Sequence, residues 1–196
     1  MKKILSGVLA LIVILSAFTP AFGAPSNKDL YEQSGEILKN AGVLQGSETG
    51  DLMLNQKLKR QDMVVLVSRL YKEENAAKKY PVKNNFKDVK NAYYKPFISW
   101  AVDKELILGM TKDTFGFDGT VTVQQFQTLL LRALGYGEEA KDWKNVPKLS
   151  ETLGLMEDLS PSSNQSVDRG LMAAMTVNAL RTNIKGSSII TLAQKL

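Results

Sequence analysis

The sequence predicts an all-α fold in which three helix–loop–helix repeats pack into one pseudo-threefold helical bundle. Apolar residues recur three and four positions apart, which places them along one face of a helix. The same helix–loop–helix pattern then recurs three times along the chain. One such unit cannot bury both of its apolar faces alone, so we expect three units to turn matching faces toward a shared centre.

Short apolar blocks at 42–46, 105–109 and 154–158 mark the three repeats. The same number of residues separates Gly42 from Arg60 and Glu105 from Val123, whereas the third loop is shorter. After each loop we predict a second, apolar helix, and these helices cover 63–70, 126–134 and 172–180. The predicted boundaries are 28–73 for repeat one, 86–136 for repeat two, 140–182 for repeat three and 183–196 for a C-terminal tail.

Each repeat opens with a first helix that carries an apolar stripe. The stripes consist of Tyr31, Ile37, Leu38 and Ala41, then Phe97, Ile98, Trp100, Ala101 and Val102, then Val146, Leu149, Leu153 and Leu155. Trp100 lies within its stripe, so we expect it in the core. The tail carries Ile189, Ile190 and Leu192, which can pack on the bundle.

The residues that open the second helices differ in their capping chemistry. Thr122 and Gln125 form a capping box, in which each side chain bonds the backbone amide of the other residue. Asp168 is expected to cap the helix of repeat three. Repeat one has Lys59 at this position, and an ammonium group cannot accept a hydrogen bond from a helix amide.

Residues 1–23 have the pattern of a signal peptide. Lys2 and Lys3 precede an apolar run at 4–18, and small residues flank a cleavage site before Ala24. The run is short for a membrane-spanning helix, although an uncleaved anchor is the alternative interpretation. We therefore expect a secreted chain, which argues against a nucleic-acid partner and, after signal cleavage, against a membrane.

The composition excludes several kinds of chemistry. The chain has no cysteine, so an exported domain must be stabilised by its core rather than by disulfides. It has no histidine, which excludes a Ser-His-Asp triad and the commonest zinc ligand. No metal-binding or cofactor-binding motif is present, and we predict neither a metal nor a cofactor. The formal charge of +5 falls to +3 without the two leading lysines, which favours an acidic partner only weakly.

The repeats resemble the S-layer homology (SLH) family. Repeat two carries the opening Phe86-Lys87-Asp88-Val89 and places Tyr93 where the family usually has Trp. Its loop contains Gly109, and its second helix opens with Thr122-Val123-Gln124-Gln125. Repeat one carries the loop residue Gly46 and the motif residue Arg60, and repeat three carries Asp168-Arg169. The resemblance extends over nearly all of 24–196.

This resemblance implies a function at the cell surface of a Gram-positive-type bacterium. In the family, grooves between repeats bind an anionic secondary cell wall polymer that often has pyruvylated sugar ends, and the motif Arg pairs with the acid. Carried over by position, the candidate ligand-binding residues are Arg60, Arg169, Gly46, Gly109, Asp88 and Tyr93. Repeat two has Val123 in place of the motif Arg, so at most two grooves retain the charged contact.

Each candidate also has a purely structural interpretation. The arginines are also explained as solvated surface residues, the glycines as helix caps, Asp88 as a cap for the following helix and Tyr93 as a packing residue. The alternative function is a secreted protein-interaction scaffold that has lost sugar binding. A carboxylate-based wall hydrolase is disfavoured because no distinctive pair of acids is present, so no catalytic residue is predicted.

Overall fold

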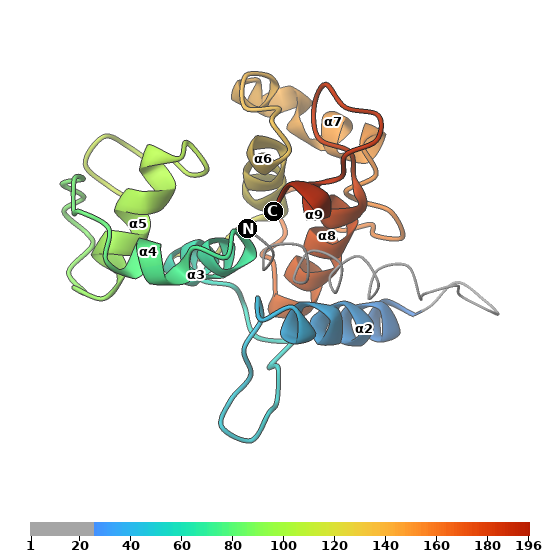
Figure 1. Ribbon diagram of the computed structural model, residues 1–196, viewed down its shortest axis with the longest axis horizontal. Helices are drawn as coiled ribbons and strands as arrows, with labels where there is room; N and C mark the ends of the chain where they lie inside the picture. The colour runs from blue at the N-terminus through green and yellow to red at the C-terminus, as the bar shows by residue number, and fades with distance from the viewer. Residues whose placement is uncertain (1–25) are drawn as a thin grey trace, which may run out of the picture.

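The computed structural model describes residues 26–196, and the predicted signal peptide lies outside this range (Figure 1). The described part is helical, and its β-bridges are isolated pairs, so the predicted all-α class is confirmed. The helices are α2 (Asn27–Asn40), α3 (Arg60–Leu70), α4 (Glu74–Lys78), α5 (Tyr94–Asp103), α6 (Val123–Ala133), α7 (Val146–Thr152), α8 (Arg169–Arg181) and α9 (Leu192–Lys195), with two 3₁₀ turns, η1 (Glu139–Lys141) and η2 (Trp143–Asn145).

The predicted helices are present, and their pairing crosses the predicted repeat boundaries. The first helices correspond to α2, α5 and α7, and the second helices to α3, α6 and α8. In space α2 packs on α8, α5 packs on α3, and α7 packs on α6 (Figure 1). Each first helix thus lies against the second helix of a different unit, which interlocks the units. The linker between the first two units also contains α4, which the sequence reading did not predict.

The segments that lead into α3, α6 and α8 are joined by a closed ring of backbone hydrogen bonds. The Leu58 amide donates to the Val167 carbonyl (2.9 Å), Val167 to Val121 (2.8 Å) and Val121 to Leu58 (3.0 Å). All three side chains are buried. The ring brings the N-termini of the three second helices together.

The caps of these helices follow the sequence. Thr122 and Gln125 form the predicted capping box, and Asp168 accepts from the Leu171 amide at 2.9 Å. Lys59 makes no capping bond to α3. The amide of the first residue of α3 is instead satisfied by a neighbouring loop, since Arg60 donates from its backbone to the Gly119 carbonyl at 2.9 Å.

The core collects the predicted apolar stripes. Trp100 and Phe97 of α5 are fully buried, as are Val146 and Leu155 around α7. The tail contributes Leu192, which is also fully buried, whereas Ile189 remains exposed. The tail is therefore part of the packed structure through α9. Among residues 26–196, no helix combines the length and apolar character needed to cross a bilayer.

The second residue after the first helix of each unit adopts a left-handed backbone conformation. Gly42, Glu105 and Gly154 have φ angles of 74°, 57° and 79°. Glycine adopts this conformation at little cost, whereas an L-residue is strained by its Cβ atom. The three units therefore share one backbone geometry at this point, and Glu105 is the residue that adopts it against its intrinsic preference.

Candidate functional site

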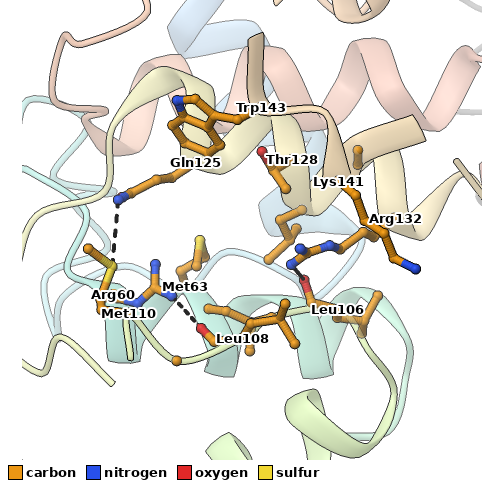
Figure 2. Close-up of a pocket in the computed structure, with 14 residues that line it drawn as sticks. Arg60, Met63, Leu106, Leu108, Met110, Gln125, Thr128, Arg132, Lys141 and Trp143 are labelled. Atoms are coloured by element: carbon orange, nitrogen blue, oxygen red, sulfur yellow. Dashed lines mark hydrogen bonds between the residues drawn. The ribbon is translucent and has the colours of Figure 1, made fainter. Parts of the chain in front are cut away.

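A groove of about 460 Å³ lies where α3 meets the loop and second helix of the following unit (Figure 2). We call it the Arg60 groove. Residues of α3, α6, the loop at 106–110 and the turns η1 and η2 form its walls. The lining residues are Arg60, Met63, Leu106, Ile107, Leu108, Gly109, Met110, Gln125, Thr128, Leu129, Arg132, Ala140, Lys141 and Trp143.

Arg60 is the first residue of α3, and its guanidinium binds the loop of the next unit. Nε donates to the Phe115 carbonyl at 2.7 Å and Nη2 donates to the Leu108 carbonyl at 2.6 Å. The guanidinium also lies over the Phe115 ring, 5.1 Å from its centroid. Only 7% of Arg60 is exposed. The side chain therefore holds the loop in place and also contributes positive charge to the groove.

The environment of Arg60 is unfavourable for its charge. Burial, together with the neighbouring Arg132, lowers the pKa of Arg60 to about 10, and Asp88 partly opposes the shift. A pKa of this size still leaves the group protonated at neutral pH. The two carbonyls supply dipoles but no negative charge, so an anionic ligand would relieve the incompletely compensated cation.

Two further cations line the groove. Arg132 of α6 is half-buried and donates from Nη1 to the Leu106 carbonyl at 3.4 Å, and burial lowers the pKa of its guanidinium while Glu105 opposes the shift. Lys141 of η1 is exposed and pairs with Glu138 at 2.6 Å. Among the described residues that line this groove, none is acidic. The groove is consequently suited to a carboxylate or another small anion.

The rim of the groove is apolar and exposed. Leu108, Met110 and Trp143 are 53%, 57% and 48% exposed. Figure 2 places Trp143 on the opposite side of the groove from Arg60 and Leu108. An exposed indole beside cationic groups can stack on the apolar face of a sugar ring while the cations bind an acid on the same sugar.

The two loop glycines are required by the tight path of their loops. A Cβ atom on Gly109 would lie 2.5 Å from Cε1 of Phe86, and one on Gly46 would lie 2.8 Å from the Asp51 carbonyl oxygen. Both distances are too short for a real contact, so a larger residue would displace the loop. Gly109 also lines the Arg60 groove.

Asp88 lies beneath the loop rather than among the groove-lining residues. Its carboxylate accepts hydrogen bonds from the amides of Phe115 (2.8 Å), Gly116 (2.7 Å) and Phe117 (2.8 Å). Partial burial alone would raise the pKa of Asp88, but these amide bonds lower it overall. Asp88 therefore shapes the loop that presents the Phe115 carbonyl to Arg60. It does not cap α5, which was the alternative interpretation.

Tyr93 precedes α5 and is partly exposed, outside the set of residues that line the groove. Its ring packs edge-on against Tyr94, with 5.0 Å between centroids, and also contacts Phe97. Tyr94 donates its hydroxyl to Asp62 at 2.8 Å, and burial together with Asp62 raises the pKa of that hydroxyl. The tyrosines thus form an aromatic cluster between α5 and α3.

Arg169 repeats the geometry of Arg60 at the contact between repeats three and one. Its Nε donates to the Leu52 carbonyl at 2.8 Å and its Nη2 donates to the Gln45 carbonyl at 2.6 Å. Leu52 and Gln45 are the counterparts in repeat one of Phe115 and Leu108. We call this contact the Arg169 interface. The structure thus brings Arg169 together with the loop that contains Gly46.

The charge around Arg169 differs from that around Arg60. Burial lowers the pKa of Arg169, and the carboxylates of Asp62 and Asp51 oppose the shift. Asp62 occupies the position that Gln125 has in repeat two. Arg69, the counterpart of Arg132, pairs with Glu74 at 2.8 Å. Two carboxylates thus act on Arg169 and Arg69 forms a direct ion pair, whereas Asp88 is the one carboxylate that acts on Arg60.

The contact between repeats two and three has lost both cationic positions. Val123 replaces the motif arginine, and Asn178 occupies the position of Arg132. Asn178 donates from Nδ2 to the carbonyls of Leu155 (3.3 Å) and Glu157 (3.0 Å). This contact therefore offers hydrogen-bonding groups without a buried positive charge.

Sequence reasoning missed three residues of the Arg60 groove, namely Arg132, Lys141 and Trp143. Arg132 could have been found, because Arg69 lies at the same position in the preceding repeat. Lys141 and Trp143 come from a segment between repeats two and three, and no repeat pattern connects them with Arg60. Within residues 26–196, no cluster of three or more acidic side chains is placed to hold a metal ion.

Comparison with known proteins matches part of the chain to a domain family and most of it to proteins of bacterial cell surfaces. Residues 85–126 match the family model of the S-layer homology domain. The chain is 28% identical over 94% of its length to the "Middle cell wall protein" of Brevibacillus brevis, of which it covers 18%. It is 25% identical over 94% of its length to the "Surface layer protein" of Brevibacillus choshinensis, of which it covers 17%.

The chain thus spans less than a fifth of the length of the curated relatives that it matches. The predicted resemblance to S-layer homology domains is confirmed for the part that contains Asp88, Tyr93 and Gly109. The matches support a place at the cell wall or cell surface. The presence of three such repeats stays a prediction.

Proposed function

We propose that this chain is a non-catalytic module that attaches non-covalently to an anionic, pyruvylated secondary cell wall polysaccharide. The observation that carries the proposal is the Arg60 groove, in which three cations and an exposed tryptophan meet and none of the described lining residues is acidic. We further propose that residues 24–196 are secreted and comprise the three repeats 28–73, 86–136 and 140–182. The matched relatives, one of which is named a cell wall protein, support the same location.

The chemistry of the groove fits an acidic sugar. A carboxylate placed against Arg60 and Arg132 would gain charge-assisted hydrogen bonds from groups already shielded from water, where such bonds are strongest. The methyl group of a pyruvate ketal and the apolar face of the sugar would contact Leu108, Met110 and Trp143. Glycoside hydrolysis requires a pair of carboxyl groups, and the described lining of the groove offers none.

The same groove favours the polysaccharide over the alternative function, a protein-interaction scaffold. In the contact between repeats two and three, Val123 replaces the motif arginine. A scaffold that had lost sugar binding would be expected to lack the arginine in every such contact. The Arg60 groove instead retains its cations, so a scaffold that had lost sugar binding would not be expected to keep it. We therefore assign sugar binding to the Arg60 groove alone.

The proposal is tested by co-sedimentation with purified cell walls before and after chemical removal of the anionic polymer. We expect binding to intact walls and its loss after extraction. Lys141→Gln should weaken binding, whereas Lys144→Gln should not, because Lys144 makes the same charge change outside the set of groove-lining residues. Undiminished binding to extracted walls would support the scaffold function instead.

A further inference from the structure

The turns η1 and η2 are short, yet they carry Lys141 and Trp143, two lining residues of the Arg60 groove. Each turn has three residues, and neither has a side-chain cap at its N-terminus. A 3₁₀ turn of this length gains little from its own hydrogen bonds, so contacts with the rest of the molecule fix its position. The positions of Lys141 and Trp143 therefore depend on what holds the two turns.

Side chains from two other parts of the described chain bond to these turns. Gln124 of α6 donates from Nε2 to the Trp143 carbonyl at 2.5 Å. From the C-terminal tail, Lys185 pairs through Nζ with Oε1 of Glu139 at 2.5 Å. The first contact lies at the start of η2 and the second at the start of η1. Lys141 consequently lies between two fixed points.

The tail is itself attached to the fold on both sides of this ion pair. The Lys185 amide donates to the Leu134 carbonyl at the end of α6 at 2.9 Å, and the Lys185 ammonium lies 5.7 Å from the centroid of the Tyr136 ring. Further along, Leu192 of α9 is fully buried, and its amide donates to the Thr182 carbonyl at 2.9 Å. The Lys185 side chain thus extends from an anchored backbone.

Gly135 makes room for the tail beside α6. Its φ angle is 93°, and a Cβ atom on Gly135 would lie 3.3 Å from Cβ of Lys185. The corresponding residue after α3 is Lys72, which adopts a left-handed φ angle of 55° despite its side chain. A glycine therefore stands where the tail packs, and a larger residue stands at the equivalent place in the preceding unit.

The ion pair between Lys185 and Glu139 is partly shielded from water. The Lys185 side chain is 44% exposed and that of Glu139 is 38% exposed. The bond from Lys185 is the main cause that lowers the pKa of Glu139, and Oε2 of Glu139 is buried with no hydrogen-bond partner among the described residues. Without the lysine, this carboxylate would lose its cation while one oxygen stays out of water. Glu139 would then turn outward and carry η1 with it.

From these contacts we infer that the tail acts as a clamp on the Arg60 groove, with Lys185 as its positioning residue. Lys185 holds η1 through Glu139, and the two turns in turn hold Lys141 and Trp143 at the groove. Lys185 does not line the groove. The inference rests on the proposed function, and it adds that the affinity for the anionic polysaccharide depends on a tail residue outside the binding surface.

The first test requires no ligand. Lys185→Met removes the ion pair and keeps an apolar stem, and Lys195→Met makes the same charge change on α9. Acrylamide quenching reports the exposure of Trp143, once the emission that remains after Trp143→Phe in each protein is subtracted. The quenching constant should rise in Lys185→Met, by at most about twofold because Trp143 is already 48% exposed. It should stay unchanged in Lys195→Met.

The second test measures the affinity for the purified anionic wall polysaccharide by calorimetry. Lys185→Met should bind about three- to fivefold more weakly, because only molecules that keep η1 in place are competent to bind. Lys185→Arg should keep the wild-type affinity. Glu139→Lys combined with Lys185→Glu restores the pair with its charges exchanged and should recover most of the affinity, which a general loss of stability would not allow.

The possible failures are distinguishable. If folded wild type does not bind the polysaccharide, the proposed function is wrong, while the quenching of Trp143 still shows whether Lys185 positions the turns. If wild type binds and Lys185→Met changes neither the quenching nor the affinity, the clamp is wrong and the Arg60 groove stands. An equal loss of affinity in Lys195→Met, or no recovery when the charges are exchanged, would also overturn the clamp.

Discussion

The Arg60 groove and the Arg169 interface share one backbone arrangement but differ in charge. Both arginines open a helix and donate from Nε and Nη2 to two carbonyls of a neighbouring loop. Among the described lining residues of the Arg60 groove none is acidic, and Asp88 is the one carboxylate that opposes the pKa shift of Arg60, whereas both Asp62 and Asp51 oppose that of Arg169. The arginine at this position thus serves the fold in both places, and its neighbours decide whether it is also available to a ligand.

The largest expected effect comes from removal of either arginine. Arg60→Ala and Arg169→Ala each leave two loop carbonyls without a donor, so each should lower the free energy of unfolding by about 2–3 kcal/mol, as measured by urea denaturation. Polysaccharide binding should disappear in Arg60→Ala and persist in Arg169→Ala. Loss of binding in a folded Arg169→Ala protein would contradict the difference between the two regions.

A smaller effect is expected from Lys141, which makes no bond to the loop, and from Arg132, whose bond to the Leu106 carbonyl is long at 3.4 Å. Arg132→Gln and Lys141→Gln should each weaken polysaccharide binding about five- to tenfold with little change in stability, because each removes a charge from the anion site. The affinities are measured by calorimetry at two salt concentrations, and the affinity of wild type should fall as the salt concentration rises. Lys144→Gln is the matched control, and an equal loss in that variant would indicate a diffuse charge effect.

The comparison is sharpened by an attempt to convert the second region into the first. We combine two substitutions. Asp62→Gln places a glutamine at the position that Gln125 has in repeat two, and Glu74→Gln frees Arg69 from its ion pair. We expect a weak second binding site, seen as a stoichiometry that rises from one toward two. Glu32→Gln combined with Glu36→Gln makes the same charge change on α2 and should leave the stoichiometry at one.

The smallest effect concerns pH. The loop amides lower the pKa of Asp88 in the folded protein, against the effect of its burial. The carboxylate therefore stabilises the fold above its unfolded pKa of about 3.9, and this contribution is lost as the pH falls through the lower folded value. In melting curves between pH 3 and pH 7, Asp88→Asn should show a shallower acid decline than wild type. An identical decline would contradict this role.

Much of the fold was predictable because it depends on local chemistry. The spacing of apolar residues predicted α5 and α6, and Thr122 and Asp168 predicted the caps correctly. The pairing of α5 with α3 was not predictable. A first helix buries the same apolar stripe whether it packs on the second helix of its own unit or on that of a neighbouring unit.

The candidate site was predictable only in part. The family resemblance pointed to Arg60 and Gly109, which the structure places together in the groove. It also pointed to Asp88 and Tyr93, which do not line the groove. Asp88 accepts hydrogen bonds from the loop amides, and Tyr93 packs in the aromatic cluster. Trp143 was missed because the turn that brings it to the groove depends on tertiary packing rather than on the repeat.

The most direct test of the central claim uses the fluorescence of the two tryptophans. Trp100 is buried in the core and Trp143 lies exposed at the rim of the Arg60 groove, so a ligand in the groove changes the environment of Trp143 alone. Titration with the purified anionic wall polysaccharide should produce a saturable change in emission that is absent in Trp143→Phe and strongly weakened in Lys141→Gln. Retention on the polysaccharide with no change in Trp143 emission would contradict binding at this groove.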